Sequence, residues 1–152
     1  MTQALQSLLE HAERERDETM ACLLQSEDSA QRLRQQLEQL LAYRSDCEAR
    51  SPGHGGLAAP IELLRCHQGL AQRLDQALAQ QSGLLQAAES QLLLQRALLL
   101  QRETRVAAVR KLIERRQHEQ QRGLARLEQK RSDEAAAQRR WHHGAHSRPI
   151  PH

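Results

Sequence analysis

Histidines are the side chains of this sequence that could bind a transition metal. Five of the eight lie in the last 35 residues, and three of these form the sequence His142-His143-x-x-His146. A structural zinc site needs four ligands in a fixed geometry. The segment from Trp141 to His152 has no periodicity that would hold its side chains in place. We therefore expect no metal site.

Cysteines are the next candidates for reactive chemistry. Cys22, Cys47 and Cys66 are odd in number and lack the C-x-x-C spacing of metal or redox sites. Cys47 and Cys66 flank a predicted loop, but a reducing compartment argues against a disulfide between them. The sequence also has no Gly-rich phosphate loop, no nucleophile with a matching base and no pair of catalytic carboxylates. We expect no enzyme, no cofactor and no ATP binding by the chain itself.

The composition of the 152 residues agrees with a chain that builds no active-site pocket. Aromatic residues, which supply most of the bulk of a globular core, amount to 1%, while 27% of residues are charged. No apolar run approaches the roughly 18–20 residues of a membrane span. The N-terminus turns acidic where a signal peptide would be basic and then apolar. The sequence predicts a reduced, cytoplasmic protein with a thin, linear core.

One apolar stripe, which we call the seam, predicts the helices that carry these side chains. Seam residues recur at alternating steps of three and four, the period of helices that pack against each other in a coiled coil. Before a Pro- and Gly-rich break they are Leu5, Leu9, Ala12, Arg16, Thr19, Leu23, Ser26, Ala30, Leu33, Leu37, Leu40, Arg44 and Cys47. After the break they are Leu64, His67, Ala71, Leu74, Leu78, Gln81, Leu85, Ala88, Leu92, Gln95, Leu99, Arg102, Val106, Val109 and Ile113.

The sequence thus predicts an all-α fold, a long antiparallel two-helix coiled-coil hairpin with a longer C-terminal helix. We expect one domain over residues 1–140, with helices at 3–49 and 60–140 and a loop at 50–59, followed by a disordered tail at 141–152. Pairing the two halves of the seam places Leu40 opposite Leu74 and Leu5 near Val109. The strongest packing is then expected beside the loop. Residues 110–140 would project beyond the hairpin, because the second helix is much the longer.

The charges of the two free ends are opposite. Residues 1–30 carry seven acids and two bases, and residues 102–140 carry twelve bases and six acids. Complementary charges beside the seam fix orientation in coiled coils, so this asymmetry supports the antiparallel arrangement. The basic end could also bind nucleic acid, but acids are interspersed in it and aromatic residues are not. We expect no nucleic-acid partner, and we expect the projecting segment to be a docking element for another protein.

Short motifs resemble the FliJ family of flagellar export proteins. Gln36, Leu40 and Tyr43 match its first-helix signature, Gln-x3-Leu-x2-Tyr-x3-Tyr, with Cys47 departing at the last position. The segment 126–134 looks like the family's C-terminal Leu-x-Gln-Lys-x-x-Asp-Glu sequence. The family's second-helix patch falls on Leu70, Leu74, Ala77 and Gln81, where an aromatic residue often stands in place of Leu70 and His in place of Gln81.

The resemblance implies a non-enzymatic stalk and adaptor of the flagellar type III export apparatus. Its partners would be the hexameric export ATPase FliI, the export gate protein FlhA and export chaperones. It would lie in the cytoplasm, peripheral to the inner membrane at the flagellar base. The gate-binding candidates by this resemblance are Gln36, Leu40, Tyr43, Leu70, Leu74 and Ala77. The ATPase-binding candidates are Leu112, Ile113, Leu124, Leu127, Arg126, Lys130 and Arg131.

Other interpretations stay open at this point. The chain could be the stalk of a virulence type III secretion system, or a structural coiled coil that associates with itself. Leu40 and Leu74 have the spacing of core residues as well as of a gate contact. Tyr43 lies next to the seam and is expected to be half exposed, which makes it the better candidate for a partner contact.

Overall fold

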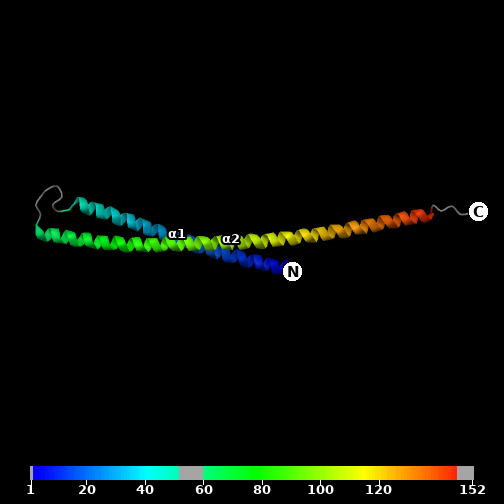
Figure 1. The fold of residues 1–152 in the computed structure, drawn as a ribbon, viewed down its shortest axis with the longest axis horizontal. Coiled ribbons are helices and arrows are strands. Elements are labelled where there is room, and N and C mark those ends of the chain that lie inside the picture. Colours follow the sequence, from blue (N-terminus) through cyan, green and yellow to red (C-terminus); the bar gives the residue numbers. More distant parts are fainter. Residues whose placement is uncertain (1, 52–59, 147–152) are drawn as a thin grey trace, which may run out of the picture. The chain divides into compact units, whose positions relative to one another are not determined.

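The computed structural model describes residues 2–51 and 60–146. It contains two helices, α1 (Thr2–Ala49) and α2 (Ile61–His146), and the described residues include no strand. The two helices run in opposite directions beside each other (Figure 1). The predicted all-α two-helix hairpin is therefore confirmed. Most of the predicted loop, residues 52–59, lies outside the described residues.

The ends of the helices at the loop follow from local chemistry. α1 has no Pro or Gly, and its last turn is closed by hydrogen bonds from Arg50 N to Asp46 O (3.1 Å) and from Ser51 N to Glu48 O (3.2 Å). α2 begins after Pro60, whose carbonyl oxygen accepts a hydrogen bond from Leu64 N at 3.1 Å. Proline suits this position because a residue at the start of a helix needs no N–H for an intrahelical bond.

α2 ends later than the sequence predicts. It continues through His146, so residues 141–146 are helical rather than disordered. The residues before Trp141 are mainly alanine, glutamine and arginine, all strong helix formers. The next proline is Pro149, so nothing in the chain stops the helix at 140. The rest of the predicted tail, residues 147–152, lies outside the described residues.

The packing divides the chain into two units. One is Ala12–Thr104, which we call the hairpin unit, and the other combines Met1–His11 with Arg105–His152, which we call the terminal unit. Each unit contains part of α1 and part of α2. The sequence predicts one domain over residues 1–140, because the seam shows no break at the boundary between the two units.

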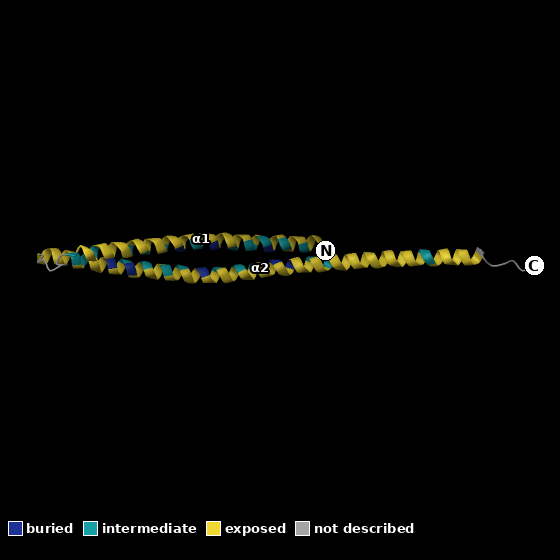
Figure 2. Cartoon of the chain, turned by 90° about the horizontal axis from the view of Figure 1, so that it is seen from above, coloured by how far each residue is buried: buried dark blue, intermediate teal, exposed yellow. Residues whose placement is uncertain are grey.

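In the hairpin unit the seam is the buried interface. Figure 2 shows the buried positions on the sides of α1 and α2 that face each other. Among the predicted seam residues of the whole chain, all of them described, only Arg44, Leu64 and Ala71 are exposed. The heptad period therefore identified the packed face of both helices correctly.

The tightest packing is not beside the loop, and that expectation is wrong. The core cluster is made by Leu23, Ala30 and Leu92, which are 8%, 0% and 3% exposed. In α1 the loop-side leucines Leu37 and Leu40 are only half-buried. Three seam residues near the loop, Arg44, Leu64 and Ala71, are exposed. Burial along the seam is therefore greater in the middle of the hairpin unit than beside the loop.

Cross-helix ion pairs run along the hairpin unit in antiparallel order. Arg44 binds Asp75 at 3.2 Å near the loop, and Arg34 binds Glu89 at 3.4 Å further along. The pairs Arg96–Glu27, at 3.5 Å, and Arg102–Glu15, at 2.6 Å, follow toward the other end of the unit. Because exposed pairs contribute little stability, about 0–1 kcal/mol each, their main effect is to select this alignment.

In the terminal unit the first turns of α1 pack against α2 further along than predicted. Val106 and Val109 are buried, and Leu5 lines a small hollow together with Ile113 and Arg116. The predicted partner of Leu5 was Val109. The observed packing covers the apolar side chain of Ile113, which would otherwise face water. The projecting segment therefore does not begin at residue 110.

Candidate interaction surfaces

The gate-binding candidates, which we call the loop patch, all lie in the hairpin unit but differ in exposure. Leu74 is buried, with 7% of its surface exposed, and Leu40 and Ala77 are half-buried. Tyr43 and Leu70 are 51% and 39% exposed, so they are available to a partner. The sixth candidate, Gln36, is exposed as well. Leu74 therefore serves the core, and the accessible part of the loop patch is Gln36, Tyr43 and Leu70.

Gln36 is held in place by a residue of the opposite helix. Gln81 Nε2 donates a hydrogen bond to Gln36 Oε1 at 2.8 Å and a second, at 3.4 Å, to the carbonyl oxygen of Leu33. Gln81 occupies a seam position, where a polar residue favours one register over others. The sequence identified Gln81 both as a seam residue and as a departure from the family pattern, but it did not predict this bridge to Gln36.

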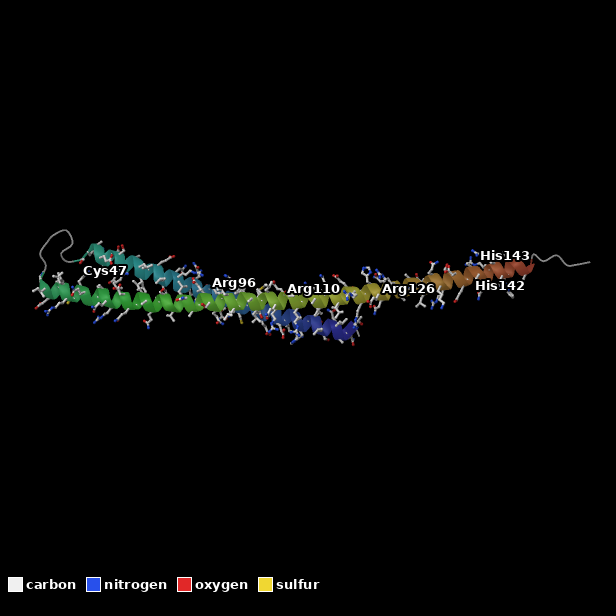
Figure 3. The ribbon with its side chains drawn as sticks, viewed as in Figure 1. Cys47, Arg96, Arg110, Arg126, His142 and His143 are labelled. Carbon is white, nitrogen blue, oxygen red and sulfur yellow. The ribbon has the colours of Figure 1, made fainter. Side chains whose placement is uncertain are left out.

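Tyr43 lies beside an ion-pair bridge at the end of α1. Arg44 binds Asp75 of α2 at 3.2 Å and Glu48 of its own helix at 3.4 Å. All three side chains are substantially exposed, at 44%, 55% and 69%. These contacts join the last turns of α1 to α2, so the backbone that presents Tyr43 is fixed by α2. Cys47, labelled in Figure 3, is half-buried one turn further along α1.

The ATPase-binding candidates divide into two groups. Ile113 is half-buried beside Leu5, and Leu112 is 38% exposed at the same level of α2. Leu124 and Leu127 are 62% and 52% exposed. The three basic candidates, Arg126, Lys130 and Arg131, are exposed. Ile113 is therefore a packing residue of the terminal unit, and the remaining candidates except Leu112 lie in residues 122–131, which we call the basic segment.

The basic segment is a helix surface that α1 does not cover. From Gln121 to Ala145 every residue is exposed except Ala135 and Ala136, which are half-buried. Figure 3 shows side chains around α2 at Arg126. Arg126 and Lys130 line one shallow hollow with Asp133. Residues 122–131 contain four bases and one acid, so the segment is a positively charged surface with two exposed leucines in it.

Sequence reasoning missed a third surface, on the outer sides of α2. Leu93, Leu94 and Leu100 are 66%, 68% and 65% exposed, although they lie next to seam residues, the buried Leu92 and the half-buried Leu99. A helix that is apolar all round is usually buried all round, yet α1 covers only one side of this one. The run Leu92-Leu93-Leu94-Gln95-Arg96-Ala97-Leu98-Leu99-Leu100 carries this information in the sequence.

The part of the chain that the structure describes contains neither a metal-binding cluster nor a membrane-spanning helix. There, no group of three or more His, Cys, Asp or Glu side chains is placed to hold a metal ion. The rings of Trp141 and His142 lie edge to face, with centroids 5.6 Å apart. Within the same residues, neither helix has a stretch long and apolar enough to span a membrane.

Comparison with known protein families gives a match over nearly the whole chain. The family described as "Flagellar FliJ protein" matches residues 1–145, which is nearly the whole chain and includes both units. No curated protein and no solved structure matches the chain. The matched range includes α1 and α2 as far as Ala145. The chain therefore belongs to the flagellar FliJ protein family.

Proposed function

We propose that this protein is a non-enzymatic stalk and adaptor of the flagellar type III export apparatus. In this proposal the basic segment binds the export ATPase FliI, and the loop patch binds the export gate FlhA. Export chaperones are further partners, and the protein lies in the cytoplasm at the inner membrane through its contact with the gate. Membership of the flagellar family supports an export-related function and favours it over a virulence secretion system.

The observation that carries the proposal is the uncovered basic segment. Leu124 and Leu127 are more than half exposed and lie three residues apart, on neighbouring positions of one helix surface. Arg126, Lys130 and Arg131 surround them. An isolated amphipathic surface of this kind gains stability when a partner covers its leucines, and its bases favour an acidic partner. A stalk that enters the pore of a ring-shaped ATPase needs such a segment.

The ATPase contact is tested with the purified ATPase. Replacing both Arg126 and Lys130 with Glu should weaken binding by about tenfold or more and remove any stimulation of ATP hydrolysis, because like charges oppose docking. The matched control is Arg73→Glu, which reverses an exposed base of the hairpin unit. If the doubly substituted chain binds and stimulates as the native chain does, the basic segment is not the ATPase contact.

The gate contact is tested separately with the cytoplasmic part of the gate protein. Tyr43→Ala combined with Leu70→Ala should weaken binding without unfolding the chain, since both side chains are exposed. Leu84→Ala, which removes a leucine that is 53% exposed elsewhere on α2, is the control. Equal loss of binding in both variants would argue against a contact centred on the loop patch.

A further inference from the structure

The seam contains two groups of buried apolar residues. The core cluster of Leu23, Ala30 and Leu92 belongs to the hairpin unit. Val106 and Val109 belong to the terminal unit and are 2% and 8% exposed. In both helices, polar seam residues stand between these groups along the sequence. We call these polar residues, together with the side chains that bind them, the polar layer.

The polar layer bonds mainly within its own helix. Thr19 Oγ1 donates to the carbonyl oxygen of Glu15 at 2.8 Å, and Arg16 binds its neighbour Asp17 at 3.0 Å, so both seam residues of α1 bond within α1. Arg102 of α2 binds the Glu15 carboxylate at 2.6 Å, but its Nε is buried and has no hydrogen-bond partner among the described residues. A buried donor without a partner favours states in which water reaches it. The polar layer therefore separates the apolar groups and favours an opening between the helices at this point.

The first turns of α1 depend on α2 for their stability. Leu5 and Gln6 line a small hollow with Ile113, and Leu9 is half-buried. The part of α1 that precedes the polar layer, residues 2–15, makes about four turns. A helix of this length is only marginally stable alone in water. Once it leaves α2, this segment therefore loses most of its stabilising contacts.

The face of α2 beneath these turns continues into the basic segment. Because an α-helix has about 3.6 residues per turn, steps of about 11 and 18 residues return to nearly the same side. Leu124 therefore lies on the same side of α2 as Ile113 and Val106, with Leu127 beside it. Val106 is 2% exposed, whereas Leu124 is 62% exposed. One apolar face of α2 is thus covered at one end and uncovered at the other.

We propose that residues 2–15, which we call the cover segment, separate from α2 while the core cluster stays packed. The polar layer sets the limit of this opening, and the pair Arg102–Glu15 is the contact that breaks at that limit. Opening extends the uncovered apolar face of α2 from Leu124 back to Val106. In the closed state the cover segment occupies this part of the face. This proposal does not depend on the proposed function.

Two cysteine variants of the full-length chain test the opening, because a buried thiol is alkylated only when the structure around it opens. Val106→Cys places a thiol beneath the cover segment, and Leu92→Cys places one in the core cluster. The two native side chains are equally inaccessible, at 2% and 3% exposed. Mass spectrometry of proteolytic peptides distinguishes the new thiols from the three native cysteines. The thiol of Val106→Cys should react at least about tenfold faster, because local opening requires less free energy than unfolding of the core.

A second substitution separates local opening from unfolding of the whole hairpin. Leu74, which is 7% exposed, lies in the hairpin unit. Leu74→Ala should speed alkylation of Leu92→Cys by about tenfold or more, because it destabilises the core. It should leave the rate of Val106→Cys unchanged, since the core stays packed in the open state. Leu9→Ala should speed alkylation of Val106→Cys, because it removes a half-buried contact of the cover segment.

Two outcomes would overturn the proposal. One is an equal acceleration of both thiols by Leu74→Ala, which would mean that the two positions open together. The other is a thiol in Val106→Cys that reacts as slowly as the one in Leu92→Cys. Fraying of the first turn alone gives this second result, because Leu5 lies at the level of Ile113, about two turns beyond Val106. Circular dichroism of each variant should show native helix content.

Discussion

Seam residues of this protein differ in burial even where their residue type is the same. Ala12 and Ala30 are 1% and 0% exposed, whereas the half-buried Leu37 and Leu40 keep part of their surface in water. A pair of helices surrounds a side chain on fewer sides than a globular core does, so a leucine is enclosed only where its neighbours are well placed. Leu74 and Leu92 are two such positions, at 7% and 3%.

Burial predicts an order of stability for leucine substitutions. Leu74→Ala should lower the free energy of unfolding by about 2–3 kcal/mol, at the lower end of values for core leucines. Leu40→Ala should cost less because its side chain is half-buried. Leu124→Ala should stay within about 0.5 kcal/mol of the native chain, as surface substitutions do. Urea denaturation followed by circular dichroism at low protein concentration measures all three. A loss at Leu124 equal to that at Leu74 would mean that the basic segment is packed within the chain.

Replacing a glycine in α2 should stabilise the fold. Gly83 lies inside the helix, and a Cβ added there would meet nothing within 4 Å. Gly83→Ala should therefore raise the free energy of unfolding by about 0.5–1 kcal/mol, because alanine loses less backbone entropy in a helix. A shift of the urea midpoint to higher concentration would confirm it. A shift to lower concentration would show that the helix at residue 83 needs the freedom of glycine.

At the scale of the helices, polar residues interrupt the seam toward the end of the hairpin unit that is far from the loop. Arg102 Nη1 donates to Glu15 Oε2 at 2.6 Å, and the two side chains are only 31% and 25% exposed. Arg102 Nε is buried and has no hydrogen-bond partner. Gln95 Oε1, two turns earlier in α2, is in the same situation. These polar seam residues favour one alignment of the two helices, and burying them costs desolvation free energy.

The Arg102–Glu15 ion pair predicts that removing one partner destabilises the fold more than replacing both does. Glu15→Ala should cost about 1–2 kcal/mol, because it leaves the half-buried charge of Arg102 without its carboxylate. Glu15→Ala combined with Arg102→Leu should recover most of this loss, since an apolar residue then occupies the seam position. Thermal unfolding of the native chain and both variants measures the difference. A double variant less stable than Glu15→Ala would show that the pair stabilises the fold beyond its desolvation cost.

The sequence predicted the helices and their packed faces well, and their alignment less well. The period of the seam depends on each helix alone, so it can be found by counting residues. The alignment depends on which residues of α1 lie opposite which residues of α2. Weak ion pairs such as Arg34–Glu89 and the burial of the Ile113 side chain decide it. The exposed leucines of α2 were missed for a related reason. A heptad pattern identifies one face of a helix, and Leu93 and Leu100 lie outside that face, next to the seam residues Leu92 and Leu99.

For the candidate surfaces, the sequence located the residues but not their exposure. Tyr43 was expected to be half exposed, and it is 51% exposed. Leu74 and Ile113 are aliphatic, as are the exposed candidates Leu70 and Leu112. Only the packing shows that Leu74 and Ile113 are covered. Motifs name positions along a helix. Whether a position faces the opposite helix depends on where that helix ends. The sequence of one helix does not specify the end of the other.

At the scale of the whole molecule, the hairpin unit and the C-terminal part of α2 differ in how much of their surface is covered. The hairpin unit closes on its own seam, while residues 121–145 of α2 leave almost every side chain exposed. The molecule thus combines a self-contained hairpin with a helix surface that is complete only in a complex. The proposed function assigns this surface, the basic segment, to the export ATPase.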